Sequence, residues 1–489
     1  MIRIWVFLLI CTPLANLVSA SLGFGTSAGS LYAQQAESLP ITLDEYLNAI
    51  RLNHPTARRI QLLDDRAAAS LRRARGAFDP NIGLDYRDKQ FDDVRYYQEG
   101  EAGLRLPTTI GGLELQTGFR WANGVLLNPE NKQPAVGQSF LGFELPLLSG
   151  LMTDEARTGL ARAQLLEQRN EQTAREMTNE LLYKGTVAYL DWAYSNRQVQ
   201  LLRQAIDLTQ VRLQQTIVGF EAGDLAAIDT LETYTQLTGR EAELFRAESE
   251  LANARLMVEA RLWADDGILQ ILPNGSLPQA LTELSTQPQL AASWQVAQLV
   301  NHPKLIQLQL QQQDLNLEAR LKRQKLLPKL NLKYQFLARG TDFASSAPSN
   351  GESTSLTDVL LQDNAWGIGF AFPILQRRAR GDLALTQIKQ EETELYLRQT
   401  RRELENGLEA IQAQLALRAR ELNLWQRNVG AYRRLLEAEL IDFELGESTV
   451  FILNSRENKL LEAELKLAKA RFEMLKLQAA QRYLMGAWQ

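Results

Sequence analysis

Leu52-Asn53-His54-Pro55 returns later in the chain as Val300-Asn301-His302-Pro303, and the two copies hold the only histidines among the 489 residues. They lie 248 positions apart, and the same offset joins Pro80 to Pro328, Leu84 to Leu332 and Tyr86 to Tyr334. An internal repeat of this kind sets the architecture before any single motif does. We therefore interpret the chain as a duplication.

The N-terminal residues have the pattern of a secretory signal peptide. Arg3 precedes an apolar run at 4–11, and the small residues Val18-Ser19-Ala20 follow it. We expect cleavage at the end of residues 1–20, or as late as Ala33, and export of the mature chain. The single cysteine, Cys11, lies in the apolar run, so the mature chain has no thiol for a disulfide, a nucleophile or a metal site.

The composition excludes some classes of partner and of membrane protein. The chain is 45% hydrophobic and 23% charged, and its net charge is −5. So small a charge gives no reason to expect a nucleic acid as a partner. Beyond the signal no run of about eighteen apolar residues occurs, so we expect no helical membrane span. If the protein crosses a membrane, strands must do it.

Each half begins with a helical segment. Thr42-Leu43-Asp44-Glu45 has the form of a capping box, in which the Thr and Glu side chains satisfy free backbone amides. His54-Pro55 interrupts this helix, which then continues to about Phe78, and the matching segment of the second half is 295–327. We expect both histidines to cap or pack these helix starts, because a metal site needs three or four convergent ligands.

After Pro80 the apolar period changes from 3.6 to 2. Residues 81–86 and 113–121 alternate in the first half, as do 330–336 and 366–372 in the second, which predicts half-buried strands within 81–146 and 329–373. The closing motif at 142–146 recurs at 369–373 with an offset of only 227. The first strand section is therefore 21 residues longer, which leaves space for an extra hairpin around 104–121. Residues 340–363 have the composition of a solvated loop.

Two stretches without proline, from Pro146 to Pro273 and from Pro373 to the C-terminus, predict very long helices. Each is broken once, at tips spanning 219–225 and 442–448. At 1.5 Å per residue, the arm from 151 to 218 would extend about 100 Å. Leucines recur every seven residues after each tip, which predicts coiled-coil packing along Leu237, Leu244, Leu251 and Val258 and along Leu453, Leu460, Leu467 and Met474.

These patterns predict an α+β protein built from two structural repeats, 39–263 and 291–486. An irregular connector at 264–290 joins them, since it contains Pro273, Pro278, Pro288 and Asn274-Gly275. Four to six strands per chain are too few for a closed membrane barrel, which needs at least about eight, so several chains would have to close one barrel. A soluble sandwich would show the same alternation, but the extreme helices disfavour it.

In its duplicated His-Pro helix starts, its Pro-bounded strands and its two glycine turns followed by heptad helices, the chain resembles TolC-like outer membrane efflux proteins. The resemblance covers residues 39–485. It implies a homotrimer in the outer membrane of a Gram-negative-type cell, with a shared 12-strand β-barrel and a helical tunnel across the periplasm. It also implies outer membrane lipid around the barrel and, as partners, an inner-membrane pump and a periplasmic adaptor that docks at the helical tip.

The resemblance also suggests functional residues. Those at the tip, in contact with the adaptor, would be Phe220, Gly223, Asp224, Phe443, Gly446 and Glu447. Asp229 and Glu232 are candidate gate residues, and because Ile452 and Ser455 stand at the matching positions of the second repeat, Arg456 and Glu457 are their candidate substitutes. The competing interpretations are a solvated helix face for Asp229 and Glu232, and helix-dipole stabilisation for Asp224 and Glu447.

The sequence contains no motif that indicates a catalytic reaction. It contains no phosphate-binding glycine loop, no nucleophile elbow and no zinc-binding His-Glu-x-x-His helix, so we expect a non-enzyme without cofactor or metal. The predicted function is export through a channel. The alternative is a periplasmic adaptor or structural coiled-coil protein that does not span the membrane, but adaptors of this kind usually carry a single helical hairpin.

Overall fold

The computed structural model describes residues 40–125, 127, 132–264, 267–284, 296–341 and 363–488. The signal peptide expected at 1–20 and its alternative cleavage point at Ala33 lie outside these residues, as do most of the loop expected at 340–363 and the last residues of the connector. The chain from Pro40 onward forms one unit, and everything below concerns this unit.

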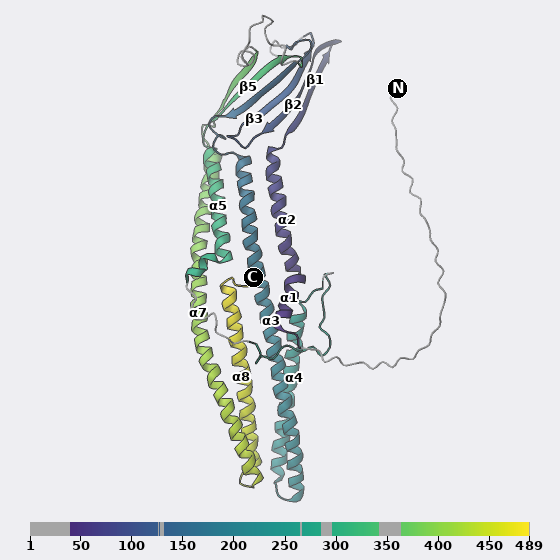
Figure 1. Cartoon of the computed structure of the whole chain (residues 1–489), viewed down its shortest axis with the longest axis vertical. Coiled ribbons are helices and arrows are strands. Elements are labelled where there is room, and N and C mark those ends of the chain that lie inside the picture. Colours follow the sequence, from purple (N-terminus) through teal and green to yellow (C-terminus); the bar gives the residue numbers. More distant parts are fainter. Residues whose placement is uncertain are drawn as a thin grey trace, which may run out of the picture. The chain divides into compact units, whose positions relative to one another are not determined.

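The elements follow the order of the two repeats (Figure 1). Those of the first half are α1 Leu43–Asn53, α2 Pro55–Arg75, η1 Gly76–Phe78, β1 Asn81–Phe91, β2 Val94–Pro107, β3 Glu114–Asn123, β4 Gln138–Pro146, α3 Glu155–Ala222 and α4 Ala227–Glu259. Those of the second half are η3 Val296–Asn301, α5 Pro303–Gln324, β5 Lys329–Arg339, β6 Asn364–Ala371, α7 Arg377–Glu444 and α8 Val450–Leu484. Among the described residues, none of the helices is apolar enough over eighteen residues to cross a membrane.

The capping interactions expected from the sequence are confirmed. Thr42 and Glu45 form a capping box at the start of α1. His54 Nδ1 accepts a hydrogen bond from the Thr56 N–H at 3.0 Å, and His302 Nδ1 accepts one from the Lys304 N–H at 3.2 Å. The two histidines therefore cap α2 and α5 in the same way, each just before the proline that begins its helix.

His302 should make stability depend on pH. Its side chain is buried, and burial together with the charge of Lys304 lowers its pKa from about 6.5 to about 4. Below pH 6.5 the unfolded chain binds a proton that the folded chain takes up only near pH 4. The free energy of unfolding therefore decreases as the pH is lowered from 6.5 to 4, by up to about 3 kcal/mol. His302→Asn keeps a capping oxygen. We expect this variant to lose less stability than the wild type between pH 7 and pH 4.5, as measured by unfolding of the detergent-solubilised protein.

His54→Asn supplies the matched control, because His54 has the same role in the first repeat but is only half-buried, and its pKa is also lowered by burial. Its removal should change the pH dependence less than the removal of His302. An unchanged acid sensitivity in His302→Asn would show that other groups cause it.

The long helices form two hairpins. α3 and α7 have 68 residues each, which corresponds to a length of about 100 Å. α3 packs against α4 and also against α8, while α7 packs against α8. Leu237, Val258, Leu453 and Met474 of the expected heptad lines are buried, and the intervening leucines are partly buried.

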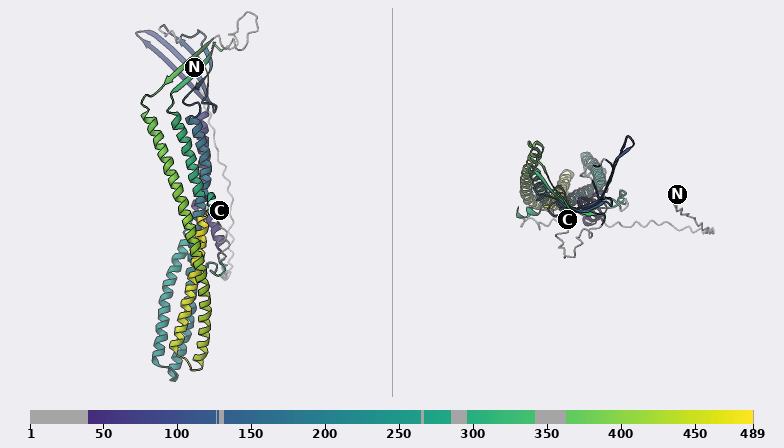
Figure 2. Two further views of the ribbon diagram at one scale, coloured as in Figure 1. Left: turned by 90° about the vertical axis from the view of Figure 1, so that its left-hand side faces the viewer. Right: turned by 90° about the horizontal axis from the view of Figure 1, so that it is seen from above.

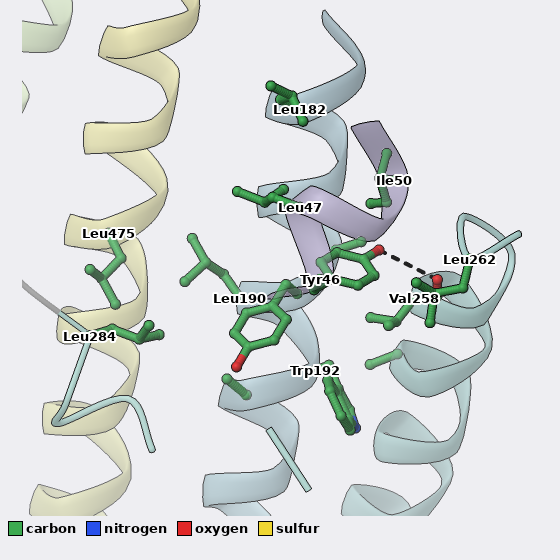
Figure 3. Packing of buried hydrophobic residues seen from close by; sticks show 14 of the residues in the cluster. Tyr46, Leu47, Ile50, Leu182, Leu190, Trp192, Val258, Leu262, Leu284 and Leu475 are labelled. Carbon is green, nitrogen blue, oxygen red and sulfur yellow. Dashed lines mark hydrogen bonds between the residues drawn. The ribbon is translucent and has the colours of Figure 1, made fainter. Parts of the chain in front are cut away.

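The largest core cluster lies where α1, α3, α4 and α8 meet. Tyr46, Tyr189 and Trp192 are among its most buried members. The Tyr46 hydroxyl donates to the Val258 carbonyl at 3.4 Å (Figure 3). The described part of the connector joins this core, since it contributes Leu272, Leu281 and Leu284. The described part of the connector thus has little regular secondary structure, but it is packed against the helices.

The six strands of the described residues form one antiparallel sheet in the order β1-β2-β3-β4-β5-β6, which is curved in the view from above (Figure 2). The first half contributes four strands and the second half two. The longer first section contains the hairpin β2–β3, which covers residues 104–121, and the β4–β5 ladder joins the two repeats.

The described strands outnumber those that the barrel size implied by the resemblance requires of each chain. A 12-strand barrel shared by three chains requires four strands per chain, whereas the described residues of this chain form six. The physical reason is the 21-residue excess of the first strand section, which forms a paired hairpin within the sheet instead of extending a loop.

Candidate functional site

The two faces of the sheet differ in chemistry. Because side chains alternate along each strand, the pairing registers place apolar and aromatic residues of all six strands on one face. Many of them are well exposed in the single chain, including Ile82 at 83% and both Trp366 and Phe370 at 66%. This apolar face comprises Ile82, Leu84, Tyr86, Leu104, Leu106, Leu115, Phe119, Trp121, Leu141, Phe143, Leu332, Tyr334, Phe336, Trp366, Ile368 and Phe370.

The opposite, polar face carries a network of hydrogen bonds and ion pairs. Arg120 of β3 is 2.9 Å from Glu101 of β2 and 3.2 Å from the side-chain oxygen of Gln335 of β5, and its guanidinium lies over the Phe140 ring. Further along the same face, Asn331 donates to Glu144 at 3.0 Å. An apolar, aromatic-rich face opposite a polar one is the pattern of strands that separate lipid from a water-filled lumen.

The two helical turns at the other end of α3 and α7 have the same geometry. Gly223 and Gly446 have φ values of +87° and +77°, the left-handed conformation expected for these glycines. The N–H of Asp224 donates to the Gly219 carbonyl at 2.9 Å, and the N–H of Glu447 donates to the Asp442 carbonyl at 2.8 Å. Both turns are therefore Schellman motifs, which satisfy the last carbonyls of the preceding helix.

The remaining tip residues differ between the two turns. Phe220 is 46% exposed, whereas Phe443 is half-buried, with the guanidinium of Arg212 5.9 Å from the centre of its ring. Asp224 and Glu447 are both exposed. The six tip residues thus lie at two solvent-accessible turns, and their contact with an adaptor stays a prediction.

Gly223→Val and Gly446→Val should each strain their turn by about 1–2 kcal/mol, because a β-branched side chain is disfavoured at positive φ. We expect faster backbone amide hydrogen exchange at 219–226 or at 442–449, with the long helices intact. Gly430→Val is the control, since a Cβ at this position of α7 meets nothing within 4 Å and its φ is not positive. Equal exchange in all three variants would contradict the prediction.

The structure places the candidate gate residues of the first repeat at the beginning of α4. The Asp229 carboxylate accepts a hydrogen bond from the Ala226 N–H at 3.0 Å, which gives it a capping role. Glu232 is half-buried one turn later. Arg456 lies on α8, where its Nε is 3.2 Å from Glu439 of α7. A hydrogen bond from Ser448, and a smaller contribution from Arg456, lower the pKa of Glu439.

Glu457, the fourth gate candidate, lies at the centre of a buried ion cluster. Its carboxylate is 3.0 Å from Arg212 of α3 and 3.7 Å from Arg240 of α4, and all three side chains are at most 10% exposed. Arg240 also donates to the Ala205 carbonyl and to Asn458 Oδ1, each at 2.9 Å. This Glu457 cluster therefore ties both helices of the first hairpin to the second hairpin.

Arg212 and Arg240 were not among the predicted site residues. Arg240 follows Leu237 by three residues, which is a core position of the heptad line. A charge at such a position is a signal of a buried ion pair. No comparable signal marks Arg212, because the sequence does not show that α8 packs against that side of α3. Within the described ranges, no group of three or more His, Cys, Asp or Glu side chains is placed to hold a metal ion.

Comparison with known proteins establishes the fold. No protein-family model matches the sequence, and no curated protein does. Solved structures do match, and three examples follow. The outer-membrane channel OprN is 15% identical, with a TM-score of 0.61, over 91% of this chain and 90% of that chain. The outer membrane protein VceC from Vibrio cholerae is 12% identical, with a TM-score of 0.61, over 91% and 96%. The CmeC outer membrane channel of Campylobacter jejuni is 12% identical, with a TM-score of 0.60, over 97% and 94%. The resemblance to TolC-like proteins is confirmed at the level of the fold.

Proposed function

We propose that this chain, which has the fold of outer membrane channels, forms a trimeric channel for export or efflux. One observation carries the proposal: a six-stranded sheet exposes an apolar, aromatic face over its whole width while its opposite face is a polar network. Such a face is stable in lipid and costly in water. The sheet would therefore lie in the outer membrane, and the helices that continue from it would extend into the periplasm.

Assembly with further copies is supported by apolar surface along the helices. Ile388, Leu395, Leu417 and Leu424 of α7 are each more than half exposed, and the first two and the last two are spaced by seven residues. A heptad line that faces solvent in one chain is suited to pack against another helix. Three copies would place α3, α4, α7 and α8 around a common tunnel.

Substrate would enter at the two turns, where a periplasmic adaptor would dock on the tip residues named above and connect the channel to an inner-membrane pump. Opening would separate the hairpins in the region of the Glu457 cluster. The channel would carry out no chemistry, and the pump would supply the energy.

The first test is the protein mass of the mature chain extracted from membranes, measured by light scattering after subtraction of the bound detergent. Three chains per particle, which precipitate when detergent is withdrawn, are expected. A monomer or dimer that stays in solution without detergent would contradict the channel and favour a periplasmic adaptor or scaffold.

Transport itself is tested by deletion of the gene. We expect the deletion strain to become at least fourfold more sensitive to some members of a panel of dyes, bile salts and antibiotics, or to accumulate an exported product, and the wild-type gene to reverse the change. The Gly430→Val variant should complement fully, whereas the Gly223→Val and Gly446→Val variants should complement poorly although they still form trimers. A deletion without any transport phenotype would count against the proposed function.

A further inference from the structure

The hairpin β2–β3 has no counterpart among the described residues of the second repeat. The offset of 248 relates β1 to β5, and the offset of 227 relates β4 to β6. Each repeat thus has one strand that follows its first helices and one that precedes its long helix. In the second repeat, β5 and β6 pair directly, whereas in the first repeat β2 and β3 lie between the corresponding strands. The hairpin is an insertion that widens the sheet by two strands.

Within the part of the chain that the structure describes, the sheet has two open edges, β1 and β6. Its six strands alternate in direction, so β1 and β6 run in opposite directions. When a second copy is placed beside the first by rotation, its β1 is antiparallel to β6 of the first copy. An even number of strands per chain is what allows an antiparallel ring to close through identical seams.

The β4–β5 ladder supplies a template for such a seam. β4 is the repeat equivalent of β6, and β5 is the repeat equivalent of β1, so the internal ladder already joins the two types of edge that two copies would bring together. Transferring its register with the two offsets pairs Ala371 with Asp85, Phe370 with Tyr86, Gly369 with Arg87 and Gly367 with Lys89 of the next copy.

From these observations, and on the basis of the proposed trimer, we propose that three copies close an 18-strand ring, in which β6 of each chain pairs with β1 of the next in the register of the β4–β5 ladder. The second copy of this chain is thus the occupant of both open edges. A ring of this size departs from the 12 strands implied by the resemblance.

The side chains at the seam are complementary. In the internal ladder, Phe143 and Tyr334 stack on the apolar face with ring centres 6.0 Å apart, and their equivalents Phe370 and Tyr86 are aromatic too. On the polar face, β6 presents only Ala365, Gly367, Gly369 and Ala371. In this register Gly369 and Gly367 lie opposite the long side chains of Arg87 and Lys89, so the bulk of one strand meets space on the other. The aromatic pair continues the apolar face across the seam near Phe370 and Tyr86, while the same register places Asp88 opposite Ile368 further along.

The inserted hairpin changes the width of the pore. With strands about 4.8 Å apart and tilted by about 40°, eighteen strands form a ring about 36 Å in diameter between backbones, against about 24 Å for twelve. The hairpin also adds Glu101, Arg105, Glu114 and Arg120 to the polar face. The chain therefore builds a lumen about one and a half times wider and lined with charges of both signs.

The test is disulfide cross-linking in isolated membranes. The chain has no cysteine beyond Cys11, so the introduced cysteines have no other native thiol to react with. Directly opposed strand residues have Cβ atoms about 5 Å apart, within reach of a bond between cysteines. The seam variant is Ala371→Cys with Asp85→Cys. Its matched control is Glu144→Cys with Lys333→Cys, the equivalent opposed pair within one chain. Ala371→Cys with Tyr86→Cys shifts the register by one residue and places the thiols on opposite faces.

We expect the seam variant to give a covalent trimer on non-reducing gels, the control to give a linked monomer and the shifted variant to give neither in quantity. A covalent product that stops at the dimer would indicate a two-chain ring of twelve strands and overturn the proposal. So would a seam variant that stays monomeric while the control links, or a stronger product from the shifted variant. Electron cryomicroscopy of the assembled protein provides an independent test, because the strands in the ring can be counted and eighteen are expected.

Failure of this inference can be told apart from failure of the proposed function, because cross-linking reports assembly and not transport. If the seam variant gives a covalent trimer but deletion of the gene has no transport phenotype, the proposed function is contradicted and the proposed seam is supported. If deletion has a transport phenotype but the seam variant gives no cross-linked product, the proposed seam is contradicted and the proposed function is supported.

Discussion

Replacing Glu457 by leucine is expected to destabilise the helical hairpins by about 3–5 kcal/mol, because it leaves the guanidinium groups of Arg212 and Arg240 buried without a counter-charge. Burial already disfavours the charged form of Arg240 and lowers its pKa, while Glu457 opposes that shift. The measurement is urea unfolding of the purified protein in detergent, followed by the loss of helical circular dichroism. The transition should move to clearly lower urea in the variant.

The matched control is Glu462→Leu on the same helix. Glu462 pairs with Lys459 and Lys466, but its side chain is 48% exposed, so the loss of these contacts should cost at most about 1 kcal/mol. Equal destabilisation by the two substitutions would show that the Glu457 cluster has no special role in stability.

A triple variant separates the charge effect from the loss of packing. Replacing Arg212 and Arg240 by methionine together with Glu457→Leu removes the whole cluster, and such replacements of buried ion pairs by apolar residues are often neutral or stabilising. We expect the triple variant to recover most of the stability lost in Glu457→Leu. If it recovers stability but not export, the cluster serves the separation of the two hairpins and not their folding.

The parts of the fold that follow from local physics could be predicted from the sequence. His54 and His302 each stand before a proline, where a side-chain acceptor caps the helix, and Gly223 and Gly446 each follow a long helix, where a left-handed residue ends it. Strand alternation placed the apolar and polar faces of the sheet correctly, because the side-chain period of two is independent of the neighbouring strands.

Features that depend on partners distant in the sequence were not predictable. Whether the 21 extra residues lengthen a loop or form a hairpin depends on pairing with the rest of the sheet, so the number of strands in the first half could not be read from the sequence. Glu457 was selected only as a substitute near a turn. Its partners come from α3 and α4. That α8 packs against the first hairpin as well as against α7 cannot be read from the periodicity of hydrophobic residues along the sequence.

Placing a lysine on the apolar face of the sheet should be far more costly than placing it on the polar face. Leu84 and Asp85 are neighbours on β1, are both exposed in the single chain and point to opposite faces. If the apolar face contacts lipid, Leu84→Lys should destabilise the membrane-inserted protein by about 2–4 kcal/mol near the bilayer centre, and by less toward its rim. Asp85→Lys should cost less than about 1 kcal/mol, since its ammonium would face water.

The measurement for this pair is folding into phospholipid vesicles as a function of urea, with the inserted fraction scored by protection from added protease. A large loss in Leu84→Lys with near-normal insertion of Asp85→Lys would support the assignment of lipid and lumen to the two faces. The reverse order would exchange the faces, which contradicts the polar lumen. If neither variant differs from the wild type, the sheet does not lie in a bilayer, and the exposed aromatic face would then have to be covered by another protein surface.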